Sequence, residues 1–253
     1  MSIELIVLLA VLALAVASML AFAVRGGARD ADAERRGSRF LLGFGDFLVH
    51  WFMWVVTPVE RLALRLGLGP DFFNLAGLGF GLASGLLIAL GYLELGGWAI
   101  ALGGVADIMD GRIARALGAD SLYGKFIDST LDRYVEVFAF LGFAVYLRGF
   151  AWGPFVVVAA LAGSLLVSYT RARGESLGVL CKEGLMQRAE RLVLMALVCL
   201  VDPWLTRRLG LPPGTALLWV LGLIAVATLA TATHRTLWIS ARLKEKDRPP
   251  ESS

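Results

Sequence analysis

The sequence predicts an all-α integral membrane protein, and three observations support this fold class. Of the 253 residues, 58% are hydrophobic, whereas soluble globular domains contain about 45–50% apolar residues. The apolar residues occur in runs of roughly 20, the length of a helix that crosses a bilayer. Glycine and proline pairs of the kind that end helices separate several of these runs. The chain shows no internal repeat and no segment with the composition of a soluble domain.

The predicted N-terminal region, residues 1–56, contains three elements. A continuous apolar run over residues 3–24 is long enough to cross the membrane. No basic residue precedes this run, which favours a retained anchor over a cleaved signal peptide. Residues 25–39 form a polar, charged linker. Residues 40–56 are aromatic and apolar but short, so we expect an interfacial or re-entrant helix.

A new helix is expected to begin at Thr57, with Pro58 at its first position and Glu60 completing a capping box. This helix would end near Gly67 and display charged residues beside several leucines. Such a pattern favours a helix that lies on the membrane surface.

Six further spans are predicted to form the core of a membrane domain that covers residues 57–242, followed by a polar tail at 243–253. The predicted architecture is therefore a six-helix core, preceded by an interfacial helix and one extra N-terminal transmembrane helix. Breaks are expected at Gly96-Gly97, Gly153-Pro154, Asp202-Pro203 and Pro212-Pro213. The expected spans are residues 72–92, 96–117, 126–147, 153–172, 189–205 and 214–240.

A glycine-rich run, Gly77-x-Gly79-x-Gly81-x-x-x-Gly85, lies inside the first core span. A nucleotide-binding loop of this kind would follow a strand, which is absent from the predicted architecture. Small residues within a span favour close helix packing, which is the interpretation we adopt.

Four aspartates in this apolar chain are the strongest functional signal. Carboxylates inside membrane spans are energetically costly and indicate a functional site. Spacings of three and four residues place each pair on one helix face, and hard divalent cations are the natural partners of such clustered carboxylates. The pattern reads Asp107-x-x-Asp110-Gly111-x-x-Ala114-Arg115, then Gly124-x-x-x-Asp128-x-x-x-Asp132.

Residues beside the aspartates indicate a phosphate-bearing ligand. Gly111, Ala114 and Gly124 are small and lie one helical turn from an aspartate, so they leave room for a bulky group to approach the backbone. Arg115 adds a cation suited to phosphate. Two metal ions held by the acids could clamp a diphosphate, so we interpret the pattern as a site for phosphoryl transfer.

Basic residues are distributed unevenly, and this distribution predicts the orientation. The formal charge of +3 is small, and no nucleic-acid partner is expected. By the positive-inside rule, the aspartates and the C-terminus face the cytoplasm. The opposite connections hold few cations, chiefly Arg148, Arg207 and Arg208. The cytoplasmic set contains Arg112, Arg115, Lys125, Arg171, Arg173, Lys182, Arg188, Arg191, Arg242, Lys244, Lys246 and Arg248.

Five arginines near one membrane face predict an acceptor that carries a phosphate, because guanidinium groups bind phosphate monoesters in a forked geometry. The alternative is that these residues are ordinary positive-inside flanks. The five are Arg171, Arg173, Arg188, Arg191 and Arg235.

The aspartate pattern resembles the signature of the CDP-alcohol phosphotransferase family at every fixed position. The resemblance implies a bacterial or archaeal enzyme of the plasma (inner) membrane with six core helices, usually a homodimer, that uses two Mg²⁺ or Mn²⁺ ions. Such an enzyme transfers a lipid phosphate from a CDP-linked donor to an alcohol and releases CMP. The resemblance further implies that Asp132 acts as general base and shares in metal ligation. Asp107, Asp110 and Asp128 would be metal ligands, and CDP would contact Asp107, Asp110, Gly111, Ala114, Arg115 and Gly124.

A second motif resembles the phosphatidylinositol-phosphate and archaetidylinositol-phosphate synthases within this family. There, Ser-Tyr-x-Lys/Arg-Ala-Arg-x-Glu precedes Arg-x-Glu-Arg, and an arginine in the last helix completes the pocket. This resemblance implies CDP-diacylglycerol as donor and inositol phosphate as acceptor, with glycerol 3-phosphate, serine or another alcohol as alternatives. The matching residues are Ser168, Tyr169, Arg171, Arg173, Glu175, Arg188, Glu190, Arg191 and Arg235.

Two alternative hypotheses for the role of the aspartates are also consistent with the sequence. The aspartates could be structural, paired with Arg112, Arg115, Lys125 or Arg133. They could also belong to a carboxylate-coupled ion transporter, because protonatable acids within the membrane mark ion paths. The transporter reading leaves the neighbouring glycines and Arg115 without a role.

Overall fold

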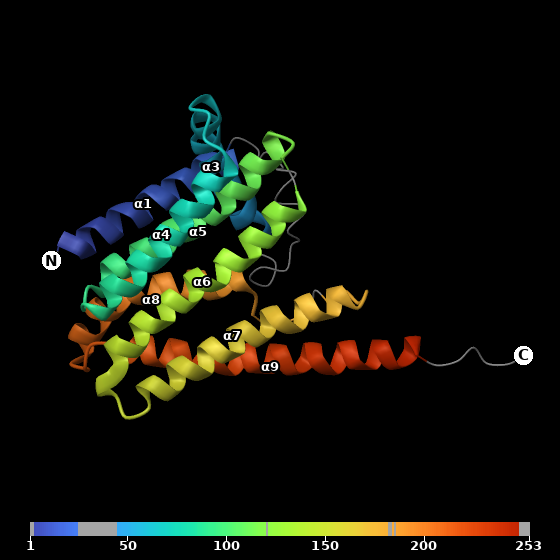
Figure 1. Ribbon diagram of the computed structural model, residues 1–253. Coiled ribbons are helices and arrows are strands. Elements are labelled where there is room, and N and C mark those ends of the chain that lie inside the picture. Colours follow the sequence, from blue (N-terminus) through green and yellow to red (C-terminus); the bar gives the residue numbers. More distant parts are fainter. Residues whose placement is uncertain (1–2, 25–44, 120, 182–183, 185, 248–253) are drawn as a thin grey trace, which may run out of the picture. The chain divides into compact units, whose positions relative to one another are not determined.

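The computed structural model describes residues 3–24, 45–119, 121–181, 184 and 186–247 (Figure 1). The predicted linker at 25–39 lies outside these residues. The described residues contain α-helices, one short 3-10 helix and no strand, as the sequence predicts. The helices are α1 (Ile3–Val24), α3 (Gly45–Arg65), α4 (Pro70–Ala89), α5 (Leu93–Ala116), α6 (Leu122–Tyr146), α7 (Gly153–Ser176), α8 (Arg188–Leu209) and α9 (Thr215–Lys246).

The chain forms two compact units, and α4, α5 and α6 each contribute to both. The first unit contains residues 1–80 and 102–132, and the second contains residues 81–101 and 133–253. In the first unit, α5 places Met109 and Ile113 in a small core with residues of α3 and α4. The other members of that core are Val56, Ala63 and Phe73.

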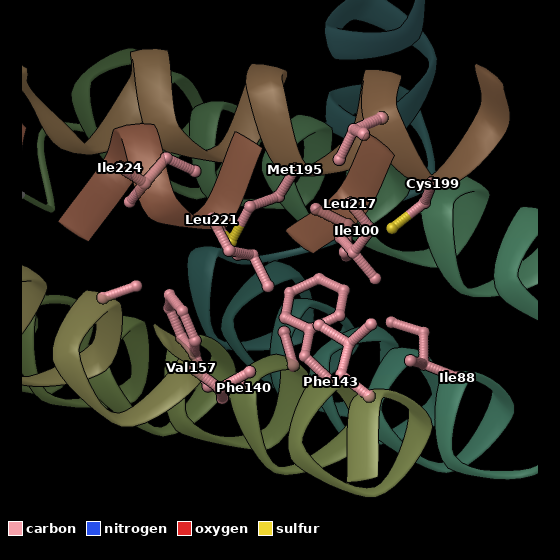
Figure 2. Close-up of a cluster of buried hydrophobic side chains, with 14 of the residues drawn as sticks. Ile88, Ile100, Phe140, Phe143, Val157, Met195, Cys199, Leu217, Leu221 and Ile224 are labelled. Carbon is pink, nitrogen blue, oxygen red and sulfur yellow. The ribbon is translucent and has the colours of Figure 1, made fainter. Parts of the chain in front are cut away.

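The second unit has a larger core to which all its helices contribute (Figure 2). Phe140 and Phe143 of α6 pack edge to face, with ring centroids 5.8 Å apart. Long helices α7 and α9 lie side by side along this unit (Figure 1). Further labelled members of the core are Ile88, Ile100, Val157, Met195, Cys199, Leu217, Leu221 and Ile224.

Glycines bring helices of the second unit into close contact, which confirms the packing interpretation of the glycine-rich run at Gly81 and Gly85. A methyl group on Gly85 of α4 would overlap the carbonyl group of Phe138 on α6. A methyl group on Gly81 would lie 2.9 Å from the Cα atom of Val135. Only hydrogen side chains permit this approach of the two backbones.

The break predicted at Gly96-Gly97 is wrong, because both residues lie inside α5. A methyl group on Gly97 would come 2.8 Å from the Cβ atom of Cys199 on α8. These glycines therefore allow close contact between helices and do not mark a turn of the chain. The chain turns instead at Gly91, whose φ of +93° lies in the left-handed region that favours glycine.

The helix start predicted at Thr57 is also wrong. Helix α3 continues through Pro58, so the two predicted surface segments form one helix. The Thr57 hydroxyl donates to the carbonyl of Met53 at 2.8 Å, as within a helix, and does not cap a new one. Val56 and Ala63, on either side of the proline, are both buried in the core of the first unit. This burial favours a continuous helix despite the hydrogen bond that proline cannot make.

The break predicted at Asp202-Pro203 fails for a different reason. Both residues lie inside α8, and the fully buried carboxylate of Asp202 accepts hydrogen bonds from Gly214 N at 2.8 Å and Leu217 N at 3.0 Å. Asp202 thus caps the first turn of α9 from a neighbouring helix. The predicted breaks at Gly153-Pro154 and Pro212-Pro213 are confirmed, because α7 begins at the former and the latter separates α8 from α9.

Four of the described helices are long and apolar enough to cross a membrane: α3 over Phe47–Arg65, α4, α7 and α9. This set includes the region predicted to be interfacial, because joining its two parts produces a longer helix. Helices α5, α6 and α8, which contain three of the predicted spans, fall outside the set. Helices α5 and α6 contain the four aspartates, so their charged residues include those that the sequence predicts to carry the chemistry.

Candidate active site

Three of the four aspartates meet in the first unit. Helix α5 presents Asp107 and Asp110, and the N-terminal half of α6 presents Asp128. One carboxylate oxygen from each residue lies within 4.8 Å of the other two. Asp110 is buried, and Asp107 and Asp128 are half-buried. Three convergent carboxylates are the oxygen-rich set that Mg²⁺ and Mn²⁺ prefer, so these residues fit a divalent cation.

Apolar residues of α5 close to the aspartates hold this arrangement in place. Met109 and Ile113 alternate with the aspartates along the helix and are almost completely buried against α3 and α4. At about 100° per residue, Met109 lies about 160° from Asp107 around the helix, and Ile113 lies about 60° from Asp110. The aspartates therefore lie on a helix that apolar contacts hold against α3 and α4.

Helix α6 begins with a cap that the sequence reasoning missed. The Ser121 hydroxyl accepts a hydrogen bond from Gly124 N at 3.0 Å, the geometry of an N-cap serine. The available signal was a serine placed directly before the helix. A methyl group on Gly124 would lie 3.2 Å from the serine oxygen. The cap and the glycine together shape the turn that precedes Asp128.

Gly111 and Arg115 lie together on α5, one turn apart. A methyl group on Gly111 would lie 3.2 Å from Nη1 of Arg115, so the guanidinium group covers the glycine. Arg115 is otherwise exposed, and Ala114 is half-buried. This arrangement places a cation suited to phosphate over the Gly111 backbone, close in sequence to Asp110.

Asp132 is not a member of the group of three clustered aspartates. It is half-buried and follows Asp128 by one turn of α6, a rise of about 6 Å. The group whose carboxylate oxygens lie within 4.8 Å contains Asp107, Asp110 and Asp128. A different role for Asp132, as the sequence analysis expects, is compatible with this separation.

The sequence predicts Arg112 to be a cytoplasmic cation that could pair with the aspartates. The structure shows that its Nε and Nη2 donate to Oε2 of Glu60 on α3, at 2.6 and 2.5 Å. The predicted surface helix therefore contributes a buried contact to the helix that bears Asp107 and Asp110. No local signal in the sequence identifies this pair.

In the second unit, Arg191 forms a buried ion pair with Glu136, a residue the sequence reasoning missed. Nε and Nη2 of Arg191 donate to the two carboxylate oxygens at 2.9 and 3.3 Å. The side chains are 0% and 2% exposed. Nη1 of Arg191 has no hydrogen-bond partner among the described residues. The missed signal was spacing, because Glu136 continues the four-residue repeat of Asp128 and Asp132.

Arg235 of α9 is also buried, and its Nη1 donates to the carbonyl of Val167 on α7 at 3.0 Å. The segment before α8 lies over the same part of α9, where Met186 N donates to the Thr231 hydroxyl at 3.3 Å. A methyl group on Gly184 would lie 3.4 Å from Nη2 of Arg235. This arginine is therefore enclosed by α7, α9 and the segment between α7 and α8.

The remaining predicted acceptor residues are more accessible. Arg171 and Arg173 are exposed at the end of α7, and Arg171 bonds Glu175 at 2.9 Å. Arg188 is half-buried at the start of α8. Of the five arginines, the structure thus buries two and leaves three open to solvent to different degrees.

Comparisons with known proteins agree with this site. Residues 70–231 match the family model for CDP-alcohol phosphatidyltransferase. The phosphatidylinositol phosphate synthase of Streptomyces avermitilis is 36% identical over 204 residues, covering 78% of this chain and 82% of that protein. The archaetidylinositol phosphate synthase of Methanothermobacter thermautotrophicus is 35% identical over 150 residues, covering 58% of this chain and 75% of that protein.

Solved structures lead to the same family. The phosphatidylinositol phosphate synthase of Mycobacterium tuberculosis with CDP-DAG bound superposes with a TM-score of 0.63 at 28% identity, covering 73% of this chain and 93% of that one. The same enzyme in complex with manganese and citrate gives 0.64 at 28% identity, with 73% and 88% covered. The predicted all-helical membrane fold and the metal-dependent enzyme class are confirmed by these similarities. The match over residues 70–231 shows that this chain belongs to the CDP-alcohol phosphatidyltransferase family.

Proposed function

We propose that this protein transfers the phosphatidyl group of CDP-diacylglycerol to a hydroxyl group of inositol phosphate and releases CMP. The observation that carries the proposal is the cluster of Asp107, Asp110 and Asp128, whose carboxylate oxygens lie within 4.8 Å of one another. The names of the relatives, phosphatidylinositol phosphate synthase and archaetidylinositol phosphate synthase, support the choice of acceptor.

The proposed reaction is the one that the resemblance to the family implies. Asp132 takes the proton from the acceptor hydroxyl, whose oxygen forms a bond to the β-phosphorus of the donor. The bond from that phosphorus to the bridging anhydride oxygen breaks, and CMP leaves with this oxygen. Two Mg²⁺ or Mn²⁺ ions held by the clustered aspartates, with Asp132 as a shared ligand, would supply the positive charge that the diphosphate requires.

The donor is held by residues around the aspartates. Arg115 beside Gly111 offers a cation to the diphosphate. Ala114 and Gly124 leave the backbone open to the cytidine moiety. Asp107 and Asp110 complete the CDP contacts. The two acyl chains stay in lipid in this arrangement, while cytidine enters from water.

The acceptor is bound through its phosphate by arginines of the second unit. Nη1 of Arg191 is a buried donor without a hydrogen-bond partner among the described residues, and such a donor is costly unless a ligand satisfies it. Arg235 provides a second buried guanidinium. Arg171, Arg173 and Arg188 add positive charge at more accessible positions. Glycerol 3-phosphate carries the same phosphate monoester and is the second candidate, ahead of serine and other alcohols.

The setting of the reaction follows from the charge distribution. Lys and Arg are concentrated in the connections that adjoin the aspartates and in the C-terminal segment, so we propose that the site faces the cytoplasm. The protein would lie in the plasma (inner) membrane of a bacterium or archaeon. A homodimer is expected from the family, with the N-terminal anchor outside the catalytic core.

Release of CMP tests the proposal. Purified full-length protein receives CDP-diacylglycerol and Mn²⁺ or Mg²⁺, with inositol phosphate, glycerol 3-phosphate, inositol or serine in separate reactions, and Asp132→Asn as the matched inactive protein. We expect release with inositol phosphate that disappears in the variant. CMP release with a different acceptor would support the proposed reaction type and would show that inositol phosphate is not the acceptor. Failure of the wild-type protein to bind donor or metal would favour the hypothesis that the protein is an ion transporter.

A further inference from the structure

We propose that α3 fixes the position of the catalytic helix α5 by packing against it, and that the Glu60–Arg112 ion pair positions Asp107 and Asp110. Glu60 and Arg112 would then be positioning residues that contact neither substrate nor metal. The activity readout rests on the proposed function, whereas the binding readout below does not depend on the identity of the acceptor.

Arg112 contacts three residues of α3 that span two helical turns. Its guanidinium donates to Oε2 of Glu60 from both Nε and Nη2, at 2.6 and 2.5 Å. Nη2 also donates to the Thr57 hydroxyl at 3.3 Å, and Nη1 lies 3.3 Å from the sulfur of Met53. Arg112 and Glu60 are only 7% and 16% exposed, so water screens this charge pair weakly.

Arg112 projects from a different side of α5 than the two aspartates. At about 100° per residue, Arg112 lies about 140° from Asp107 and about 160° from Asp110 around α5. Met109 and Ile113, on its side of the helix, are buried against Val56 and Ala63 of α3. Apolar contacts of this kind resist separation of the two helices. The directional ion pair adds resistance to rotation and to sliding along the axis.

Helix α3 is itself held from its other side by α1. The ring of Phe22, a buried residue of α1, lies 5.6 Å from Phe47 and 5.8 Å from Trp54. The indole N–H of Trp51 donates to the hydroxyl of Ser18 at 3.0 Å. Helices α1 and α3 precede residue 70, where the family match begins. The N-terminal region thus reaches the catalytic helix through α3.

A competing explanation is that Glu60 and Arg112 act on the metal only through their charges. Charges of opposite sign change the affinity for a nearby cation in opposite directions, so loss of the Glu60 carboxylate would weaken Mn²⁺ binding and loss of the Arg112 guanidinium would strengthen it. Comparison of Glu60→Gln with Arg112→Gln therefore separates the two explanations. If position matters, both variants weaken Mn²⁺ binding.

The experiment measures Mn²⁺ affinity of the full-length protein in lipid nanodiscs by electron paramagnetic resonance, together with kcat and KM for CDP-diacylglycerol. The variants are Glu60→Gln, Arg112→Gln and the double substitution. Glu245→Gln is the matched control, because Glu245 forms an exposed ion pair with Arg242. Thr57→Val is a milder change of the same contact, which keeps the proposal testable if Glu60→Gln fails to fold.

We expect Glu60→Gln and Arg112→Gln each to weaken Mn²⁺ binding about 10-fold and to lower kcat similarly, as when partners that orient metal ligands are removed. KM should change by less than about twofold, and the double variant should be no worse than either single variant, because both remove the same contact. Thr57→Val should show a smaller loss in the same direction, and Glu245→Gln none.

Wild-type Mn²⁺ affinity in a folded Glu60→Gln variant would overturn the inference while leaving the proposed function intact. Wild-type affinity in Thr57→Val, with Glu60→Gln unfolded, would likewise overturn it. A wild-type protein that binds no Mn²⁺ and releases no CMP would overturn both the proposed function and this inference.

Discussion

Glu136 of α6 and Arg191 of α8 form a bidentate ion pair within the core of the second unit, with N–O distances of 2.9 and 3.3 Å. Burying two charges is unfavourable unless each finds its partner with good geometry. The pair fixes the plane of the guanidinium group and leaves Nη1 without a hydrogen-bond partner among the described residues. Glu136 thereby orients an arginine that we propose binds the acceptor phosphate.

Removing the acid should therefore destabilise the protein. Glu136→Gln leaves a buried guanidinium without its counter-charge, and we expect a loss of about 3–5 kcal/mol in the free energy of unfolding. Replacing both residues with methionine should be less harmful than Glu136→Gln alone, because no buried charge remains. Chemical denaturation in detergent micelles measures both. Equal stability of wild type and Glu136→Gln would contradict a buried, paired arginine.

The separation of Asp132 from the other aspartates predicts two distinct phenotypes. Asp110→Asn removes a buried member of the cluster and should weaken Mn²⁺ binding by about 10-fold or more. Asp132→Asn should abolish CMP release and retain most of the Mn²⁺ affinity, because it removes the proposed base and leaves the three clustered carboxylates. Titration of Mn²⁺ against each variant distinguishes them. Equal loss of affinity in both variants would show that Asp132 is a full metal ligand.

Close contact between α4 and α6 predicts different tolerance at two glycines of one helix. Gly85→Ala would place a methyl group on the carbonyl of Phe138, whereas a methyl group on Gly79 meets nothing within 4 Å. We expect Gly85→Ala to destabilise by about 1–3 kcal/mol through overpacking. Gly79→Ala should be neutral or stabilising by up to about 1 kcal/mol, because alanine favours the helix. Thermal unfolding of the two variants provides the measurement, and the opposite ranking would be inconsistent with this helix contact.

Asp202 should be needed for the start of α9. Asp202→Ala removes the acceptor of two backbone N–H groups, at Gly214 and Leu217, and we expect a loss of about 1–3 kcal/mol. Asp247→Ala, at an exposed position after the other end of α9, is the control and should have little effect. Thermal unfolding again supplies the comparison. An Asp202→Ala variant as stable as the control would argue against the cap.

Sequence patterns predict the features of this protein that depend on neighbours along the chain. The spacing of Asp107, Asp110 and Asp128 places their side chains on defined helix faces, and the structure brings these faces together. The small residues of the glycine-rich run similarly predict close packing. These predictions hold because helical periodicity sets the direction in which each side chain projects from its own helix.

Features that depend on distant partners could not be predicted in this way. Pro58 and Pro203 follow the local rules for a helix boundary, yet buried contacts on both sides of Pro58 and the capping role of Asp202 keep their helices continuous. The partners of Arg112 and Arg191 lie 52 and 55 residues away in the chain. Nothing adjacent to Arg112 distinguishes a positioning role from an ordinary basic flank, and the motif around Arg191 does not identify Glu136 as its partner.

The most direct test of the central claim is the identity and yield of the lipid product. Purified protein is incubated with CDP-diacylglycerol, inositol phosphate and Mn²⁺, and CMP and lipids are quantified by mass spectrometry. We expect one phosphatidylinositol phosphate for each CMP released, and neither product with Asp132→Asn. CMP without an inositol-bearing lipid, or no CMP from a wild-type protein that binds Mn²⁺, would contradict the proposed phosphatidyl transfer to inositol phosphate.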